Sequence, residues 1–239
     1  MPATRRTVSR VRHMSSLTVR PYQPGPTEDA ALRDICLRTG DNGTDASSLY
    51  ALPWLLAAVY LDPYLKFHPH HCIVIADGDT PVGYAVGTPD TTAFTSRLTE
   101  HWWPQVLNRV AQVQNTGTHL LPADHALVTT IHQWALPPAS VISSYPAHLH
   151  IDLLDAAQGG GWGRRAINEL LTTMRQAHVP GIHLGVSAAN TRAQGFYTHI
   201  GFTVVAFAPW GSFMGMSLTT PPEATPAALH SQVHGKTSL

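Results

Sequence analysis

The fold of this chain is decided by residues 147–163, which read AHLHIDLLDAAQGGGWG. Apolar and polar residues alternate between Ala147 and Leu154, a period that is typical of a strand. Apolar side chains then recur at helical spacing, at Ile167, Leu170, Leu171 and Met174. Pro180 and Gly181 end that pattern. The segment therefore predicts a strand that enters a helix through a glycine-rich loop.

The glycine loop has the composition of a phosphate site. Glycines stand at 159, 160, 161 and 163, and they let a ligand approach backbone N–H groups at the positive end of the following helix. Arg164 and Arg165 add positive charge. A simple turn would need fewer glycines, so we expect the loop to bind phosphate or pyrophosphate.

Two common phosphate ligands fit the loop poorly. The Gly-Lys-Ser/Thr of an ATP- or GTP-binding P-loop is absent. Residues 161–166 match the dinucleotide pattern G-x-G-x-x-A, but that fold needs an acidic residue about 20 positions later. No Asp or Glu stands between Glu169 and Glu223. A nucleotide-dependent oxidoreductase is therefore a disfavoured alternative.

The pattern outside this segment predicts a mixed α/β chain. Asn190 is placed to cap a short helix that ends near His199. Thr27 is placed to cap an earlier helix that ends at Gly40, and Pro104 must kink or split a third helical stretch. Strands are expected at 17–22, 71–76, 81–88, 182–186, 202–208 and 213–218, and further helical stretches at 47–61 and 91–115. Residues 116–146 show no clear periodicity of apolar residues and predict no particular element.

Composition limits the class of protein. The chain has 239 residues, of which 44% are hydrophobic, with 15 Lys+Arg against 15 Asp+Glu. The hydrophobic fraction is enough for a large core, and zero net charge argues against a generally basic nucleic-acid binder. The longest apolar run, residues 51–60, is interrupted by Pro53 and too short to cross a bilayer. Two cysteines, Cys36 and Cys72, form neither a disulfide framework nor a thiolate zinc site.

We expect a single domain over residues 17–218. A flexible basic arm is expected at 1–16, which lacks the apolar segment of a signal peptide, and a flexible tail at 219–239. We expect the protein in the cytoplasm, as a monomer or a homodimer. We expect neither a nucleic acid nor a membrane as a partner.

Two motifs together resemble the GNAT superfamily of N-acetyltransferases. Residues 158–163, QGGGWG, match its Gln/Arg-x-x-Gly-x-Gly/Ala pattern, and residues 190–202, NTRAQGFYTHIGF, resemble its N-x-x-A-x-x-F-Y-x-x-x-G-F segment. Residues 36–43 and 148–154 also resemble bacterial acetyltransferases similar to the C-terminal acetyltransferase-like domain of O-GlcNAcase. The resemblance implies an α/β fold with a twisted, largely antiparallel mixed sheet, flanked by helices and splayed at the acetyl-CoA site.

The resemblance also implies a cofactor site for acetyl-CoA. No metal is expected, because Pro69 breaks the helical spacing of the histidines at 68, 70 and 71. The pantetheine arm and acetyl group would pair with the fourth strand near Ile151 and Leu153, and the pyrophosphate would lie on the glycine-loop amides. The implied cofactor-binding residues are Ile151, Leu153, Leu154, Gln158, Gly159, Gly160, Gly161, Trp162, Gly163, Arg164, Asn190 and Tyr197.

The resemblance gives Tyr197 the role of general acid, which protonates the departing thiolate of coenzyme A. A phenol remains protonated at neutral pH and is able to donate to sulfur. Some family members carry a glutamate base where this chain has Ala147. Asp152 is our first candidate for the base, with His148, His150 and Asp155 as alternatives.

The implied reaction is direct acetyl transfer from acetyl-CoA to an amine, either a small molecule or a protein lysine. A module that binds coenzyme A or a partner protein without turnover is the alternative.

Overall fold

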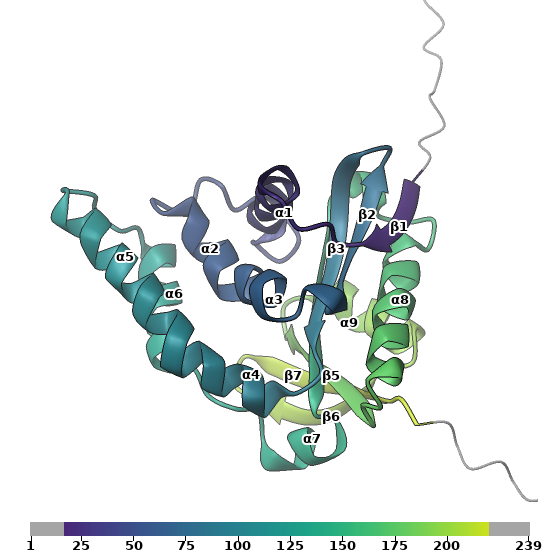
Figure 1. Ribbon diagram of the computed structural model, residues 1–239. Helices are drawn as coiled ribbons and strands as arrows, with labels where there is room; N and C mark the ends of the chain where they lie inside the picture. Colours follow the sequence, from purple (N-terminus) through teal and green to yellow (C-terminus); the bar gives the residue numbers. More distant parts are fainter. Residues whose placement is uncertain (1–16, 220–239) are drawn as a thin grey trace, which may run out of the picture.

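The computed structural model describes residues 17–219, in which a single sheet carries the fold (Figure 1). The expected arm, residues 1–16, and residues 220–239 of the expected tail lie outside this range. The seven strands are β1 (Leu17–Pro21), β2 (Cys72–Asp77), β3 (Thr80–Thr88), β4 (Ala147–Leu153), β5 (Gly181–Ser187), β6 (Thr203–Ala208) and β7 (Gly211–Ser217). Their order is β1-β2-β3-β4-β5-β7-β6, and only the β4–β5 pair is parallel.

Helices cover both faces of the sheet (Figure 1). One face carries α1 (Pro26–Thr39), α2 (Pro53–Tyr60), α3 (Asp62–Phe67), α4 (Thr91–Arg97), α5 (Trp103–Asn115) and α6 (Pro122–His132), and the other carries α8 (Trp162–Gln176). Two further helices, α7 (Ala139–Ser144) and α9 (Thr191–His199), precede β4 and β6. Buried apolar side chains accordingly form two clusters, one on each face of the sheet. The expected fold class is confirmed.

The parallel strands β4 and β5 separate soon after they begin. They pair only through Ala147 with Ile182 and His148 with His183, whereas β5 pairs with β7 from Gly181 to Ser187. β4 continues to Leu153 alongside β3. The last residues of β4 therefore leave one edge of this strand without a strand partner.

Some expected element boundaries are wrong. The first helix starts at Pro26 with Gly25 at its N-cap position, rather than with Thr27 as the cap. The second starts at Pro53 rather than near residue 47. Its preceding turn is held by Asp124 of α6, whose carboxylate accepts from the amides of Ala51 and Leu52 at 2.9 and 3.0 Å.

The third helical stretch is split as expected, with Pro104 in the first turn of α5. A π-helical turn, Leu98–Trp102, joins α4 to α5. Residues 116–146, which carry no clear sequence period, contain α6 and α7.

Both cysteines are free and buried, and burial raises the pKa of each thiol. Neither is therefore poised as a nucleophile. Between residues 17 and 219 the helices are all too short or too polar to span a membrane.

Candidate active site

The glycine loop forms a concave backbone surface between β4 and α8. Gly159, Gly160 and Gly161 all have left-handed backbone angles, with φ of +73°, +57° and +77°. Glycine adopts this conformation with little strain, and successive backbone N–H groups in a turn form a concavity that binds anions. Because α8 begins at Trp162, the positive end of its dipole adds to the same concavity.

Gln158 holds the loop between two other elements. Its Nε2 donates to the carbonyl of Leu153 at 2.9 Å, and its Oε1 accepts from Nη2 of Arg192 at 2.7 Å. The side chain thereby connects the end of β4 to the start of α9. It also places the guanidinium of Arg192 next to the glycine loop.

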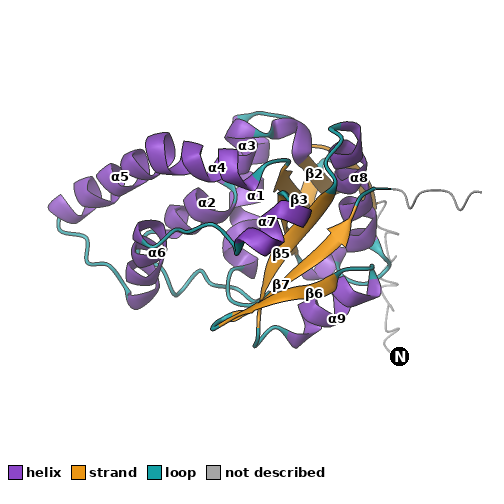
Figure 2. Cartoon of the chain, turned by 90° about the horizontal axis from the view of Figure 1, so that it is seen from below, coloured by secondary structure: helices purple, strands orange, loops and turns teal. Residues whose placement is uncertain are grey.

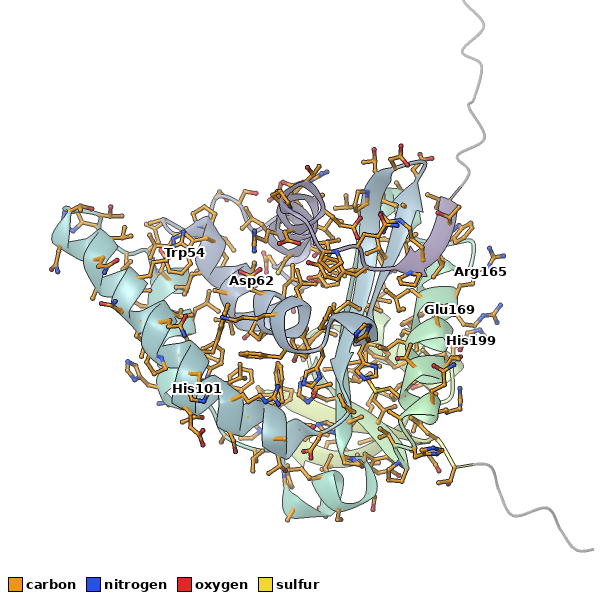
Figure 3. All side chains as sticks on the ribbon, viewed as in Figure 1. Trp54, Asp62, His101, Arg165, Glu169 and His199 are labelled. Atoms are coloured by element: carbon orange, nitrogen blue, oxygen red, sulfur yellow. The ribbon has the colours of Figure 1, made fainter. Side chains whose placement is uncertain are left out.

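The two arginines at the start of α8 point in different directions. Arg164 lines a pocket that also contains residues of β4 and α9. Arg165 lies over the ring of Trp162, with its Cζ 4.3 Å from the ring centroid, and points away from the sheet (Figure 3). Arg164 and Arg192 are therefore the cations near the loop, whereas the sequence indicated Arg164 and Arg165.

A pocket of about 560 Å³ opens at the splay between β4 and β5. It gathers residues from the α1–α2 connection, β4, the glycine loop and α9. The predicted site residues among its lining are Ile151, Asp152, Leu153, Gln158, Gly159, Gly160, Gly161, Gly163, Arg164, Asn190 and Tyr197. Segments far apart in the sequence thus meet in one cavity.

Leu154 and Trp162 do not line this pocket. The amide of Leu154 donates to the carbonyl of Val82 at 3.0 Å, and its side chain packs against the core on the α1 face. Trp162 packs against the opposite core and carries Arg165 on its ring. Neither side chain lines this cavity, so a contact of either residue with a ligand there would have to be made by its backbone.

The free edge of β4 presents the two amides that the sequence indicated. N–H groups along an antiparallel strand alternate between its two edges. The amide of Leu154 is bonded toward β3, so those of Ile151 and Leu153 point to the edge that β5 has left. This edge can therefore accept an extended ligand as though it were another strand.

Asn190 caps α9, as its sequence position predicted. Its Oδ1 accepts from the amide of Ala193 at 3.0 Å. Asn190 also lines the pocket, so it is able to cap the helix and contact a ligand at the same time.

Tyr197 reaches the pocket from α9. The residue is only 8% exposed and packs against Phe196 and Phe202. Burial, together with the nearby carboxylate of Asp152, raises the pKa of its phenol above the ordinary value. The hydroxyl therefore remains a proton donor at every physiological pH.

Asp152 is the carboxylate of this pocket. Burial raises its pKa from 3.8 to about 6, although the hydrogen bond from the Tyr84 hydroxyl acts in the opposite direction. The group is ionised at neutral pH, but it accepts a proton more readily than an exposed aspartate. That property suits a general base.

His148 is satisfied within the fold. Thr91 donates its hydroxyl proton to the carbonyl of Pro146 at 2.6 Å, so Nδ1 of His148 must donate to Thr91 at 2.8 Å. Nε2 then accepts from the hydroxyl of Tyr64 at 2.6 Å. Burial lowers the pKa of His148 well below its ordinary value, so this imidazole is a neutral structural group.

Sequence reasoning missed part of the pocket. Arg192 lies inside the recognised α9 motif, but the motif gives it no role. Thr39 and residues 42–44 line the opposite wall. Residues 39, 42 and 43 belong to the segment 36–43 that resembles bacterial acetyltransferases, but the resemblance gave them no role, and their place in the pocket depends on how α1 packs on the sheet. Among residues 17–219, His, Cys, Asp and Glu side chains form no group of three that suits a metal ion.

Comparison with known proteins places this geometry in a family. A sequence model of the acetyltransferase (GNAT) family matches residues 126–202. The crystal structure of a protein named SsHAT is 32% identical, with a TM-score of 0.73 over 86% of this chain and 100% of that chain. The Pyrococcus horikoshii protein PH1933 shares the fold at 15% identity, with a TM-score of 0.52 over 84% of this chain and 98% of its own.

The sequence is also similar to protein O-GlcNAcase of Rattus norvegicus. The two are 22% identical over 189 residues, which make up 79% of this chain and 20% of that protein. This chain thus spans about a fifth of the length of the curated relatives that it matches. The chain belongs to the GNAT family of acetyltransferases, because these similarities agree with its sheet topology, its glycine loop and the separation of β4 from β5.

Proposed function

We propose that this protein transfers an acetyl group from acetyl-CoA directly to the nitrogen of an amine. The observation that carries the proposal is the single pocket in which the glycine loop, the free edge of β4, Tyr197 and Asp152 meet. These parts supply anion binding, a place for an extended ligand, a proton donor and a proton acceptor.

The residues fit acetyl-CoA from one end of the pocket to the other. The amides of Gly159 to Gly161, with Arg164 and Arg192, suit its pyrophosphate. The pantetheine arm has amide groups that are able to pair with the free edge of β4. The amide of Ile151 is then available to donate to the acetyl carbonyl, and a fixed donor of this kind stabilises negative charge that develops on the oxygen.

Tyr197 and Asp152 complete the proton balance of the transfer. The amine nitrogen forms a bond to the acetyl carbon, and the bond from that carbon to sulfur breaks. Tyr197 gives its proton to the departing thiolate, while Asp152 takes one from the nitrogen, directly or through water. No acyl-enzyme is needed, and the buried neutral thiols of Cys36 and Cys72 are unsuited to form one.

Replacement of Tyr197 by phenylalanine tests this assignment. If the phenol acts only as the carbon–sulfur bond breaks, Tyr197→Phe lowers kcat and kcat/KM together by about 10²-fold, with the dissociation constant of acetyl-CoA nearly unchanged. Thiol release is measured with an amine that the wild type acetylates, and binding is measured by calorimetry.

Tyr50→Phe is the matched control, because Tyr50 lies before α2 and does not line the pocket. Wild-type turnover in Tyr197→Phe would remove the phenol from the mechanism. Tight binding of acetyl-CoA by the wild type, without turnover of any amine, would favour the non-catalytic module instead.

A further inference from the structure

A second cavity, of about 660 Å³, lies next to the proposed acetyl site. Its walls come from α4, the α6–α7 connection, the first half of β4, the middle of β5 and the tip of the β6–β7 hairpin. Figure 2 shows this hairpin extending from the sheet toward the side on which α6 lies.

The second cavity adjoins the first along β4. His148, Leu149 and His150 line it, and the next residue, Ile151, lines the first pocket. Consecutive strand residues are separated by about 3.3 Å. The amide of Ile151, where we place the acetyl carbonyl, therefore lies one residue along β4 from the lining of the second cavity, close to an acceptor bound there.

The walls of the second cavity are aromatic and carry no formal charge. Trp134, Trp210 and Phe213 supply aromatic surface, and the rings of Trp210 and Phe213 are 5.3 Å apart in an edge-to-face arrangement. Asp, Glu, Lys and Arg are all absent from the described residues that line the cavity. An ammonium group held between these walls would therefore find no carboxylate partner on them, and the carboxylate of Asp152 lines the first pocket instead.

Histidines of β4 and β5 supply imidazoles to the walls of this cavity. Nδ1 of His183 donates to the carbonyl of Tyr145 at 2.6 Å, which leaves Nε2 with a lone pair. His150 also lines the cavity, and burial lowers its pKa to about 4. An environment that keeps an imidazole uncharged is also unfavourable for an ammonium ion, and it offers nitrogen lone pairs to the N–H groups of a neutral amine.

We propose that the acceptor is a primary aromatic amine whose nitrogen is attached to the ring, and that it binds uncharged in this second cavity. The inference rests on the proposed acetyl transfer and names its substrate class. An alkylamine, with a pKa near that of lysine at about 10.4, would have to lose a proton to enter. An aniline is already neutral at physiological pH, and its flat ring suits the walls formed by Trp134, Trp210 and Phe213.

Two isomeric amines test the proposal. 4-Methylaniline and benzylamine have the same atoms and nearly the same size, but only benzylamine is protonated at pH 7. We expect kcat/KM for 4-methylaniline to exceed that for benzylamine by at least tenfold, and to exceed the values for spermidine and a lysine peptide. Thiol release and the mass of the product measure transfer. Calorimetric titration into the protein saturated with coenzyme A measures acceptor binding without turnover.

Variants on the β6–β7 hairpin locate the binding site. Trp210→Ala removes an aromatic wall, and we expect it to raise the KM for 4-methylaniline about tenfold, which corresponds to about 1.4 kcal/mol of binding. The affinity for acetyl-CoA should stay unchanged. Val204→Ala is the control, because Val204 lies on the same hairpin outside the cavity and is 49% exposed.

A third variant introduces the missing charge. Gln133 lines the cavity, and Gln133→Glu should shift the preference toward benzylamine. Acetylation of benzylamine, spermidine or the peptide, but not of 4-methylaniline, would overturn the acceptor class and leave acetyl transfer standing. Failure to acetylate any amine while acetyl-CoA binds would contradict both proposals, as would failure to bind acetyl-CoA.

Discussion

At the scale of one residue, Asp152 couples stability to activity. Burial raises its pKa from 3.8 to about 6, so the folded state binds a proton at this carboxyl more tightly than the unfolded state. The stability from this group is therefore fully present below pH 3.8 and is lost as the pH rises through about 6. At neutral pH the protein carries a carboxylate that folding disfavours. We infer that an ionisable carboxyl stands at position 152 because the activity needs it, and not because it stabilises the fold.

Asp152→Asn should therefore stabilise and inactivate the protein together. One pKa unit corresponds to about 1.36 kcal/mol, and the carboxylate faces an open pocket, so we expect about 1–2 kcal/mol of added stability at pH 8. This gain should shrink as the pH falls through 6. Loss of a general base should lower kcat/KM about 10²–10⁴-fold. Urea unfolding at several pH values, with turnover assays, measures both effects.

Asp155→Asn provides the control, because Asp155 is exposed and lies outside the pocket. A wild-type kcat/KM that rises with pH through about 6 would agree with Asp152 as the base. A variant that is less stable at pH 8 and still follows the wild-type pH profile would make Asp152 a structural residue only.

At the scale of elements, the glycine loop determines whether α8 presents its amides to a ligand. Gly161 has a φ of +77°, and a Cβ added there would meet only Nη2 of Arg164, at 3.8 Å. Gly161→Val should therefore leave the protein folded, at a cost of about 1–2 kcal/mol for the left-handed backbone. The branched side chain would occupy the space above the amides. We expect the affinity for coenzyme A, measured by calorimetry, to fall at least tenfold.

Gly117→Val is matched to this variant, because Gly117 also has a positive φ, +90°, with open space around it, and lies outside the pocket. Both variants should lose similar stability, but only Gly161→Val should lose affinity. Equal affinity for coenzyme A in Gly161→Val and wild type would mean that the loop is only a turn.

The elements also show what the sequence is able to predict. β4, the loop and α8 were predictable because their signals are local: alternation, a run of glycines and a helical period. The start of α2 was not, because its turn is held by Asp124, more than 70 positions away. Likewise, Arg192 enters the pocket through its bond to Gln158, a contact that only the folded chain creates. The sequence therefore predicts elements with local signals, but it does not predict contacts between residues far apart in the chain.

At the scale of the whole molecule, the first pocket joins parts of the fold that otherwise pack in separate cores. Thr39 comes from α1 on one face of the sheet, whereas Tyr197 comes from α9 on the other. A ligand that contacts both parts binds the folded state alone and must stabilise it by mass action. At about 100 times its dissociation constant, acetyl-CoA should add about 2.7 kcal/mol.

For a domain of this size, that free energy corresponds to a rise in Tm of roughly 5–10 °C. NAD and ATP should produce no such shift, because the chain lacks the ribose acid and the P-loop lysine that these ligands need. Thermal unfolding with each ligand measures the effect, and Gly161→Val should show a smaller shift with acetyl-CoA than the wild type, by half or more. A shift with NAD and none with acetyl-CoA would show that the glycine loop serves a dinucleotide, and the proposed transfer would then have no acyl donor.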